Sequence, residues 1–333
     1  MKNFKIIILS LLSLNLSGCF FDISMPLVGL NEETSLTRLT GSENVLFKAL
    51  YDIKKSGSTA TKIEKLDLTS GIQQVIVGTS TAGTSDGTGT SATFTRIRAM
   101  LLSSDSNYLW VADNCALRKV DLSTLIVSTV AGTVNTCGEV NGFGTSIRFN
   151  PIYGLAEKDG FIYLATSAII KKYNINTTES TDFVGTTLGD IDGIGTAAKI
   201  MPKAMIKFGN NLYIADINQK IKKINLDTAQ VSTIAGAGVS ESVDGIGLSA
   251  KIDFTDPLTS FTTDNLNVLF WTEKDKIRKM NLSTLEVETL LSTDLLQDKD
   301  GDLSQSKMFR PSGIFFNTKG LFISNQYNIR RLF

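Results

Sequence analysis

The chain has 333 residues, 42% of them hydrophobic, with 33 basic and 33 acidic side chains. This hydrophobic content is typical of a globular protein, and the balanced charge excludes a strong overall field that would attract nucleic acid. Histidine is absent, which argues against serine triads, zinc hydrolases and imidazole-dependent lyases, and leaves carboxylate or calcium chemistry open.

A signal peptide is predicted at the N-terminus, over residues 1–18. Lys2 and Lys5 precede an apolar run, residues 6–16, that is too short to cross a bilayer comfortably. The run ends in Leu16-Ser17-Gly18-Cys19, which resembles the lipobox of bacterial lipoproteins, where the cysteine is acylated and becomes the mature N-terminus. The alternative is an ordinary secretory signal in which Cys19 is only a small apolar residue.

Acylation of Cys19 would anchor the protein, because acyl chains bury their CH₂ groups in the bilayer. Residues 19–35 would then be the lipidated cysteine and a tether, and residues 36–333 the folded domain. Phe20 stands where the enterobacterial pattern places an aspartate for retention at the inner membrane, so the outer membrane is weakly favoured. We predict a lipid-anchored protein of the bacterial cell envelope, with the membrane leaflet left open.

A short strand that ends in basic residues recurs six times along the chain. Two clear copies are Leu117-Arg118-Lys119-Val120 and Ile277-Arg278-Lys279-Met280. The six copies begin at positions 63, 117, 170, 221, 277 and 329, in steps of 51 to 56 residues. A repeat of this length predicts a propeller or a solenoid.

Each repeat contains four predicted strands. In the second repeat, an aromatic and β-branched strand at residues 108–113 precedes the basic strand. An outer strand at residues 127–132 and a glycine-rich connection follow, and residues 151–156 open the next unit. Four strands in about 53 residues make one propeller blade.

The chain resembles the NHL-repeat family of the TolB-like propeller class. The family pattern is apolar-Tyr-apolar-Ala-Asp, then Ile-Arg-Lys-apolar-Asp, then Val-x-Thr-apolar-Ala-Gly, and residues 108–132 and 211–236 follow it closely. The resemblance covers residues 60–333. It implies an all-β fold, a six-bladed β-propeller of four-stranded antiparallel blades.

Ring closure is predicted from the two ends of the chain. The sequence stops at Phe333 directly after a basic strand, so the last blade lacks its outer strand. Residues 36–41 have the form of that strand and are predicted to pair beside residues 329–332, which covers an exposed edge. Because only 21 residues separate Gly41 from Ile63, against 37 at the same place in the second repeat, the first blade is expected to be short or irregular.

The connections between blades share a glycine-rich motif. Such loops cradle phosphate when they lead into a helix, but these lead into strands. We therefore predict turns in which Asp or Asn caps the loop and Gly takes a positive φ. The four motifs begin with Asp86-Gly87, Asn141-Gly142, Asp192-Gly193 and Asp244-Gly245.

A second candidate site has three alternating carboxylates, Asp298, Asp300 and Asp302, as calcium loops do. However, the glycine of this segment follows the second Asp and not the third, and Phe309 stands where calcium loops place a bidentate Glu. A turn is favoured, with calcium as the alternative.

Cys115 and Cys137 are predicted to form a disulfide. Cys115 lies in the turn between the second and third strands, and Cys137 lies in the connection to the next blade. In a four-stranded blade both loops emerge on the same face, and an exported protein folds where disulfides persist. The alternative is two free, buried thiols.

The adjacent basic residues of the third strands should point to opposite faces of each blade. Some would pair with carboxylates at strand ends, such as Asp113, Asp216 and Glu273. A structural role is favoured over a mixed surface for partner contact.

The resemblance implies a binding or scaffold module without catalysis or cofactor, whose ligand is a protein, peptide or glycan on one propeller face. Its membrane contact would be the lipid on Cys19. One alternative is a lactonase-like hydrolase with a carboxylate-bound divalent metal in the central channel, for which Asn150, Asp253 and Asp256 are the nearest candidate ligands. Another is an envelope structural protein that binds a second envelope component.

Overall fold

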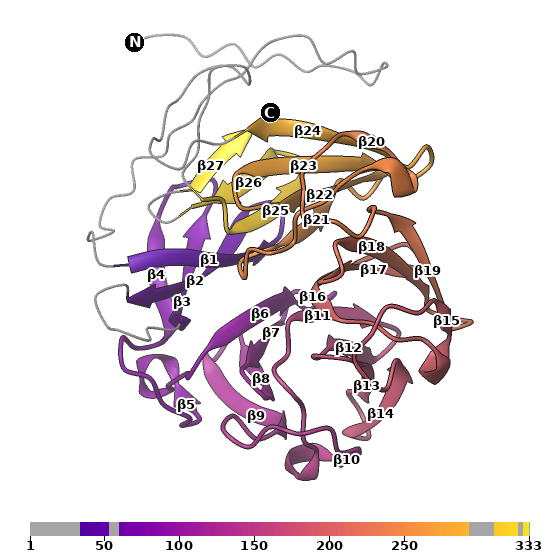
Figure 1. The fold of residues 1–333 in the computed structure, drawn as a ribbon. Coiled ribbons are helices and arrows are strands. Elements are labelled where there is room, and N and C mark those ends of the chain that lie inside the picture. Colours follow the sequence, from indigo (N-terminus) through magenta and orange to yellow (C-terminus); the bar gives the residue numbers. More distant parts are fainter. Residues whose placement is uncertain (1–33, 53–59, 293–309, 326–328, 333) are drawn as a thin grey trace, which may run out of the picture.

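The computed structural model describes residues 34–52, 60–292, 310–325 and 329–332. These residues form six antiparallel sheets that stand in a ring around a central axis (Figure 1). Helical structure in the described residues is confined to four short 3-10 turns. The predicted six-bladed β-propeller is therefore confirmed. Within the same residues, no helix has the length and apolar character needed to cross a membrane.

Blades 2 to 5 are built alike. In blade 2 the chain runs outward from the inner strand β6 (Ile97–Leu102) through β7 (Tyr108–Asp113) and β8 (Ala116–Asp121) to β9 (Ile126–Gly132). A two-residue strand, β5 (Gly87–Thr88), pairs on the outside of β9 and is followed by the 3-10 turn η1 (Gly89–Ser91).

The next three blades repeat this order, each with a short strand paired outside its fourth long strand. Blade 3 has β10 (Gly142–Phe143), η2 (Gly144–Ser146), β11 (Gly154–Lys158), β12 (Phe161–Ala165), β13 (Ile170–Asn174) and β14 (Glu179–Val184). Blade 4 has β15 (Gly193–Ile194), η3 (Gly195–Ala197), β16 (Pro202–Phe208), β17 (Asn211–Asp216), β18 (Lys220–Asn225) and β19 (Gln230–Ala235). Blade 5 has β20 (Gly245–Ile246), η4 (Gly247–Ser249), β21 (Phe261–Thr263), β22 (Val268–Thr272), β23 (Lys276–Asn281) and β24 (Glu286–Ser292).

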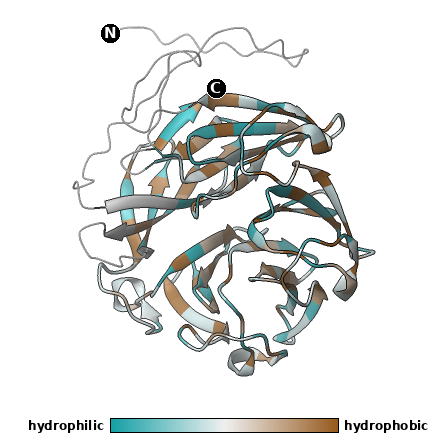
Figure 2. Ribbon diagram, in the orientation of Figure 1, coloured by the Kyte–Doolittle hydropathy of each residue, from teal (hydrophilic) through white to brown (hydrophobic). Residues whose placement is uncertain are grey.

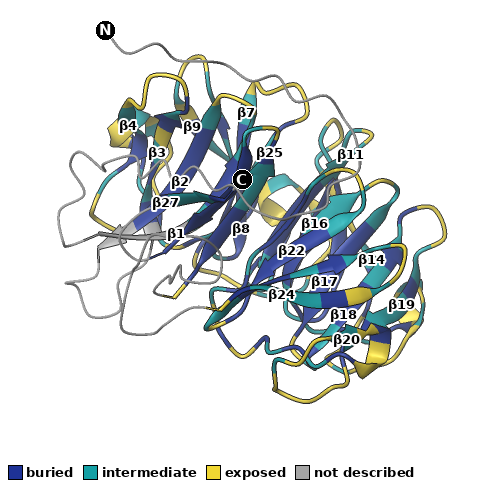
Figure 3. Ribbon diagram, turned by 90° about the horizontal axis from the view of Figure 1, so that it is seen from above, coloured by how far each residue is buried: buried dark blue, intermediate teal, exposed yellow. Residues whose placement is uncertain are grey.

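The hydrophobic core lies between neighbouring blades, because each sheet is covered on both faces. The second strands are accordingly almost continuous runs of buried aromatic and branched residues, coloured dark blue in Figure 3. Figure 2 shows brown, hydrophobic segments in the strands of every part of the ring. Between blades 4 and 5, Phe254 packs against Phe261 and Trp271 with ring centroids 5.8 and 6.4 Å apart. The polar residues concentrate in the turns, which Figure 3 shows as exposed.

Blade 1 differs from its prediction. It consists of β1 (Thr34–Gly41), β2 (Val45–Asp52), β3 (Ala60–Asp67) and β4 (Gln73–Gly78), paired in that order. The assignment of residues 36–41 to an outer strand beside residues 329–332 is therefore wrong, because β1 pairs with β2 and is the inner strand of blade 1. The first blade was expected to be short or irregular, and in the described residues its sheet has four strands where the sheets of blades 2 to 5 have five.

Blade 6 contains three described strands, β25 (Gly313–Asn317), β26 (Gly320–Ser324) and β27 (Ile329–Leu332). The ring closes where the inner strand β25 lies beside β1 (Figure 1). A Cβ atom at Gly313 would lie 3.2 Å from the backbone nitrogen of Leu39, so the two strands approach closely there. The Asn317 side chain also donates to the carbonyl of Ser42 at 2.9 Å. The N-terminal strand thus helps to close the ring, by packing against blade 6 and not by extending its sheet.

Candidate functional site in the central channel

The first basic residue of each third strand in blades 2 to 5 is buried and forms ion pairs within its own blade. In blade 2 the Arg118 guanidinium is fully buried and lies 2.9 Å from Asp86 and 3.1 Å from Asp113. The second residue points to the other face, where the Lys119 ammonium lies 4.5 Å from the centroid of the Tyr108 ring. The predicted split of the basic pairs is therefore confirmed, and their buried members are structural.

The other blades repeat the pattern with changed partners. Glu273 pairs with Arg278 at 3.3 Å, as predicted, whereas no ion pair joins Asp216 to the buried Lys222 in the described residues. The Asp216 carboxylate instead accepts backbone N–H groups of Met201 and Asn218, and burial raises its pKa. Further partners of these cations lie in the connections: Asn141 and Glu139 for Lys171, Asp190 and Asp192 for Lys222, and Asp244 for Arg278. Lys171 also pairs with Asp182 of the neighbouring strand β14, at 2.6 Å.

Each glycine-rich connection contains the predicted glycine with a positive φ, but the first glycine of each motif lies in a short strand, and Asp86 bonds to another strand instead of capping its own loop. The carboxylate of Asp86 accepts hydrogen bonds from the backbone N–H and the hydroxyl of Thr129, both at 2.9 Å, and so ties the connection to β9. The second glycine, Gly89, has a φ of 56°, a left-handed conformation that favours glycine. Each motif leads into a 3-10 turn of three residues, which offers no phosphate-binding helix.

The disulfide between Cys115 and Cys137 is present, with the two Cα atoms 5.3 Å apart. It joins the β7–β8 turn to the connection after β9, on the face where the inner strands begin. Beside it, the Asn114 side chain donates to the carbonyl of Val134 at 3.1 Å.

Two predicted sites, Cys19 and the alternating carboxylates Asp298, Asp300 and Asp302, lie outside the described residues. They remain predictions. In the part of the chain that the structure describes, no group of three or more Cys, Asp or Glu side chains is arranged to hold a metal.

The structure does not bring the candidate metal ligands of the channel together in a cavity. The Asp253 carboxylate accepts hydrogen bonds from Ser240 and Thr255, and Asp256 accepts one from the backbone N–H of Leu258. Neither these carboxylates nor Asn150 lines the cavity at the ring centre. Among the residues that do line it, no side chain carries a carboxylate.

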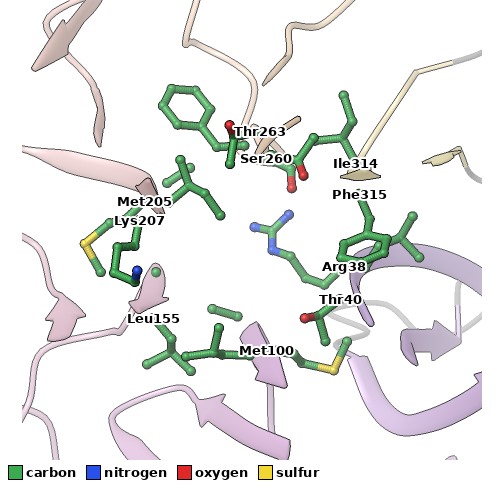
Figure 4. A pocket seen from close by; sticks show the side chains of 18 of the residues that line it. Arg38, Thr40, Met100, Leu155, Met205, Lys207, Ser260, Thr263, Ile314 and Phe315 are labelled. Carbon is green, nitrogen blue, oxygen red and sulfur yellow. The ribbon is translucent and has the colours of Figure 1, made fainter. Parts of the chain in front are cut away.

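A cavity of about 240 Å³ occupies the central channel, and the inner strands of all six blades line it (Figure 4). Its walls are about equally polar and apolar, and Met100, Leu155, Met205, Ile314 and Phe315 are among the apolar residues. Polar groups stand among them. They are Arg38, Thr40, Tyr153, Lys207, Thr259, Ser260, Thr262, Thr263 and Asn265.

Arg38 reaches toward the middle of this cavity from β1 (Figure 4). Its position follows from the strand register, because a β-bulge between Leu36 and Arg38 shifts the pairing with β2, and bulges re-aim the side chains beside them. The corresponding residues of the other inner strands are small and leave room for the guanidinium. They are Ala99, Gly154, Ala204, Ser260 and Gly313, each opposite the same position of its second strand.

Backbone carbonyls of two blades hold the Arg38 guanidinium. Its Nε donates to the carbonyl of Arg98 at 2.6 Å, and Nη1 donates to that of Leu258 at 3.3 Å. Burial and the neighbouring Arg98 lower the pKa of Arg38 to about 10, although Asp256 opposes the shift. Arg38 therefore remains a cation at neutral pH, in a site where positive charge is disfavoured.

The sequence analysis missed Arg38 because it placed residues 36–41 at the outer edge of the ring. An alignment of the inner strands by their pairing with the second strands would have found it. In that alignment one blade has an arginine at the position where the five other blades have a small residue. Lys207 was also missed, because the sequence analysis did not assign its strand, β16, to the lining of the channel. Its Nζ lies 3.5 Å from the carbonyl of Gly209.

Comparisons with known proteins support the fold. No family model matches the chain, so membership of the NHL-repeat family stays a prediction. One curated relative, the chloroplastic protein SUPPRESSOR OF QUENCHING 1 of Arabidopsis thaliana, is 26% identical in an alignment of 269 residues that covers 74% of this chain. The chain spans only 25% of that relative's length.

Solved structures from Bacteroides thetaiotaomicron are similar over most of the chain. A protein of unknown function has a TM-score of 0.65 and 14% identity, with 95% of this chain and 72% of that one covered. An auxiliary nutrient binding protein has a TM-score of 0.65 and 13% identity, with 90% and 69% covered. At these identities the similarity shows a shared propeller fold.

Proposed function

We propose that this protein is an extracytoplasmic binding module that takes a small ligand into the central channel of its propeller. The observation that carries the proposal is the cavity, to which all six inner strands contribute and into which the one arginine of its lining extends. A concave site in which polar groups converge among apolar side chains is the usual form of a ligand pocket.

Two further points favour binding over catalysis. One of the similar structures is an auxiliary nutrient binding protein. The cavity lining offers cations, hydroxyls and apolar groups, but it contains no carboxylate, thiol or imidazole, which are the common general bases and metal ligands. The lactonase-like alternative would need carboxylates in this channel.

The proposed location is the bacterial cell envelope, with the protein held by a lipid on Cys19. The lipobox and the Cys115–Cys137 disulfide favour an exported protein, since disulfides persist in oxidising compartments. Incorporation of labelled palmitate by the full chain, and its loss in Cys19→Ala, is the direct test. An unlabelled wild-type chain would contradict the anchor.

The ligand site can be tested with a soluble chain that begins at residue 20. Melting temperatures would be measured against a panel of sugars, sugar acids, amino acids and short peptides. A ligand at 100 times its Kd stabilises the fold by about 2.7 kcal/mol. Binding should disappear in Ser260→Phe, which fills the cavity.

A matched control is Thr88→Phe. Thr88 is exposed in β5, and the equivalent position of the next blade already holds an exposed phenylalanine, Phe143. Loss of binding in both variants, or in neither, would contradict the central channel as the site.

A further inference from the structure

Positive side chains gather where the inner strands begin, at one mouth of the channel. Arg98 and Lys203 sit at the bulges of β6 and β16, where the register skips one residue. Arg98 Nε donates to the side-chain oxygen of Asn114 at 3.1 Å, and Lys203 Nζ donates to the carbonyl of Thr255 at 2.9 Å. Arg310 lies in the approach to β25, 3.6 Å from Asp256.

Carbonyl and amide oxygens help to hold three of these cations in place. Arg38, Arg98 and Lys203 each donate to such an oxygen, and Arg38 points into the cavity. Burial is the largest cause that lowers the pKa of each, and like charges add to it for Arg38 and Arg98. Two acids oppose these shifts: Asp256 at Arg38 and at Lys203, and Asp253 at Lys203. Asp256 also lies 3.6 Å from Arg310.

We propose that the ligand of the central cavity carries an anionic group, a carboxylate, sulfate or phosphate, that pairs with Arg38. The inference rests on the proposed function, because it assigns the chemistry of the same cavity. A planar guanidinium can bind such a group through two parallel hydrogen bonds. The cations at the mouth would also draw an anion toward the channel.

The cavity limits the size and the polarity of the rest of the ligand. Its volume of about 240 Å³ lies below the range of about 300–1,000 Å³ that is usual for drug-sized ligands. This size suits a molecule such as a monosaccharide acid. The hydroxyls of Thr40, Ser260 and Thr263 can bond to ligand oxygens, while Met205 and Phe315 can pack on its apolar face (Figure 4).

The test compares probes that differ in charge but hardly in size. Titration calorimetry with D-glucuronate and D-glucose, on the chain from residue 20, should show glucuronate binding about tenfold tighter or more, as expected for hydrogen bonds to a charged group. Competition by inorganic phosphate and sulfate then distinguishes a free oxyanion from a sugar acid. Preference for glucose, or equal affinity, would overturn the inference.

Variants assign the preference to Arg38. Arg38→Gln should remove the preference for glucuronate over glucose, and Arg38→Lys should keep part of it. The two variants together distinguish the effect of the positive charge from the effect of the two hydrogen bonds to backbone carbonyls. Lys279→Gln is the matched control, because it deletes one positive charge near Glu288 on the outer strands of blade 5. An unchanged preference in Arg38→Gln, or an equal loss in Lys279→Gln, would contradict the assignment.

The two proposals fail in different ways. If glucose or another neutral probe binds and Ser260→Phe abolishes that binding, the cavity is a ligand site and only the anion inference is wrong. If no charged or neutral probe binds to the wild-type chain, both proposals are wrong.

Discussion

The Nη1 atom of Arg118 lies 3.1 Å from Oδ2 of Asp113, and both side chains are fully buried. The same pairing recurs in blade 5, where Glu273 stands at the end of the second strand and faces Arg278. In blades 3 and 4 the third strand carries lysine, and no acid at the end of the second strand pairs with it among the described residues. In blade 3 the lysine pairs with Asp182 of β14, and in both blades it pairs with acids in the connection. There Glu139 and Asp190 each precede the turn residue by two positions. The two arginines thus pair with an acid at the end of the second strand, whereas the two lysines pair with acids elsewhere in the blade.

We predict that Arg118→Met destabilises the protein by about 3–5 kcal/mol, because Asp113 is then a buried charge without its ion-pair partner. The double variant Arg118→Met with Asp113→Leu should recover much of this loss, since well-packed apolar residues often replace a buried pair at little cost. Urea denaturation measures both. A double variant less stable than the single one would contradict the prediction.

The control for this pair is on the surface. Lys279 and Glu288 lie 2.6 Å apart and are both partly exposed, so Lys279→Ala should cost only about 0–1 kcal/mol.

Asp121 gives a prediction about pH. Its carboxylate accepts hydrogen bonds from the Ser123 hydroxyl and from the backbone N–H groups of Thr124 and Ser123, which lower its pKa to about 2. The pKa of an unfolded Asp is about 3.9, so the unfolded state takes up protons first as the pH falls. The stabilisation is therefore complete above about pH 4 and is lost toward pH 2.

Asp121→Asn distinguishes the contribution of the turn hydrogen bonds from that of the ionisable carboxyl group, because it keeps the acceptor oxygen and removes the charge. Asn174 and Asn281 make the same backbone contacts in blades 3 and 5, so the variant should fold with little change at neutral pH. Between pH 4 and pH 2 the wild-type chain should lose stability relative to the variant, in thermal melts at each pH. A difference that does not change with pH would contradict the lowered pKa.

The disulfide should contribute about 3 kcal/mol, because it closes a loop across 22 positions of the unfolded chain. Cys115→Ser with Cys137→Ser should lower the melting temperature accordingly. Alkylation of the unfolded chain without reductant should label neither cysteine. Labelling of both would show that the thiols are free.

Gly313→Ala tests the closure of the ring. The new Cβ would meet the Ser324 hydroxyl at 2.6 Å and the backbone nitrogen of Leu39 at 3.2 Å, so blade 6 must shift away from blade 1. Overpacking of this kind costs about 1–3 kcal/mol. Gly138→Ala is the control, because its Cβ would meet only the flexible Arg148 side chain within 4 Å. Equal stability of the two variants would contradict a close-packed closure.

The repeat predicted the architecture because each blade repeats the same burial pattern, and the third strand carries a recognisable buried cation. A sequence pattern shows that a segment forms a strand more reliably than it shows which other strand that segment pairs with. Residues 36–41 fit an inner strand as well as an outer one, and only the pairing with Lys48 and Ala49 distinguishes the two. The error concealed Arg38, whose importance depends on which residues stand beside it in the ring.

The partner of Lys222 was missed for a similar reason. Asp216 is close in sequence, but its carboxylate is occupied by the backbone at the start of β16, and the connection brings Asp190 and Asp192 to the lysine instead. Contacts between a strand and a connection some 30 residues earlier cannot be read from a local pattern.

A ring of six identical blades would offer a centred ligand six equivalent orientations. Arg38 removes this degeneracy, since one sector carries a long cation and the five others carry Ala, Gly or Ser at the same level. The near-symmetric ring therefore has one blade that differs from the other five at the channel axis. A molecule held there would adopt one angular setting relative to the blades, and its opposite end would always point to the same sector.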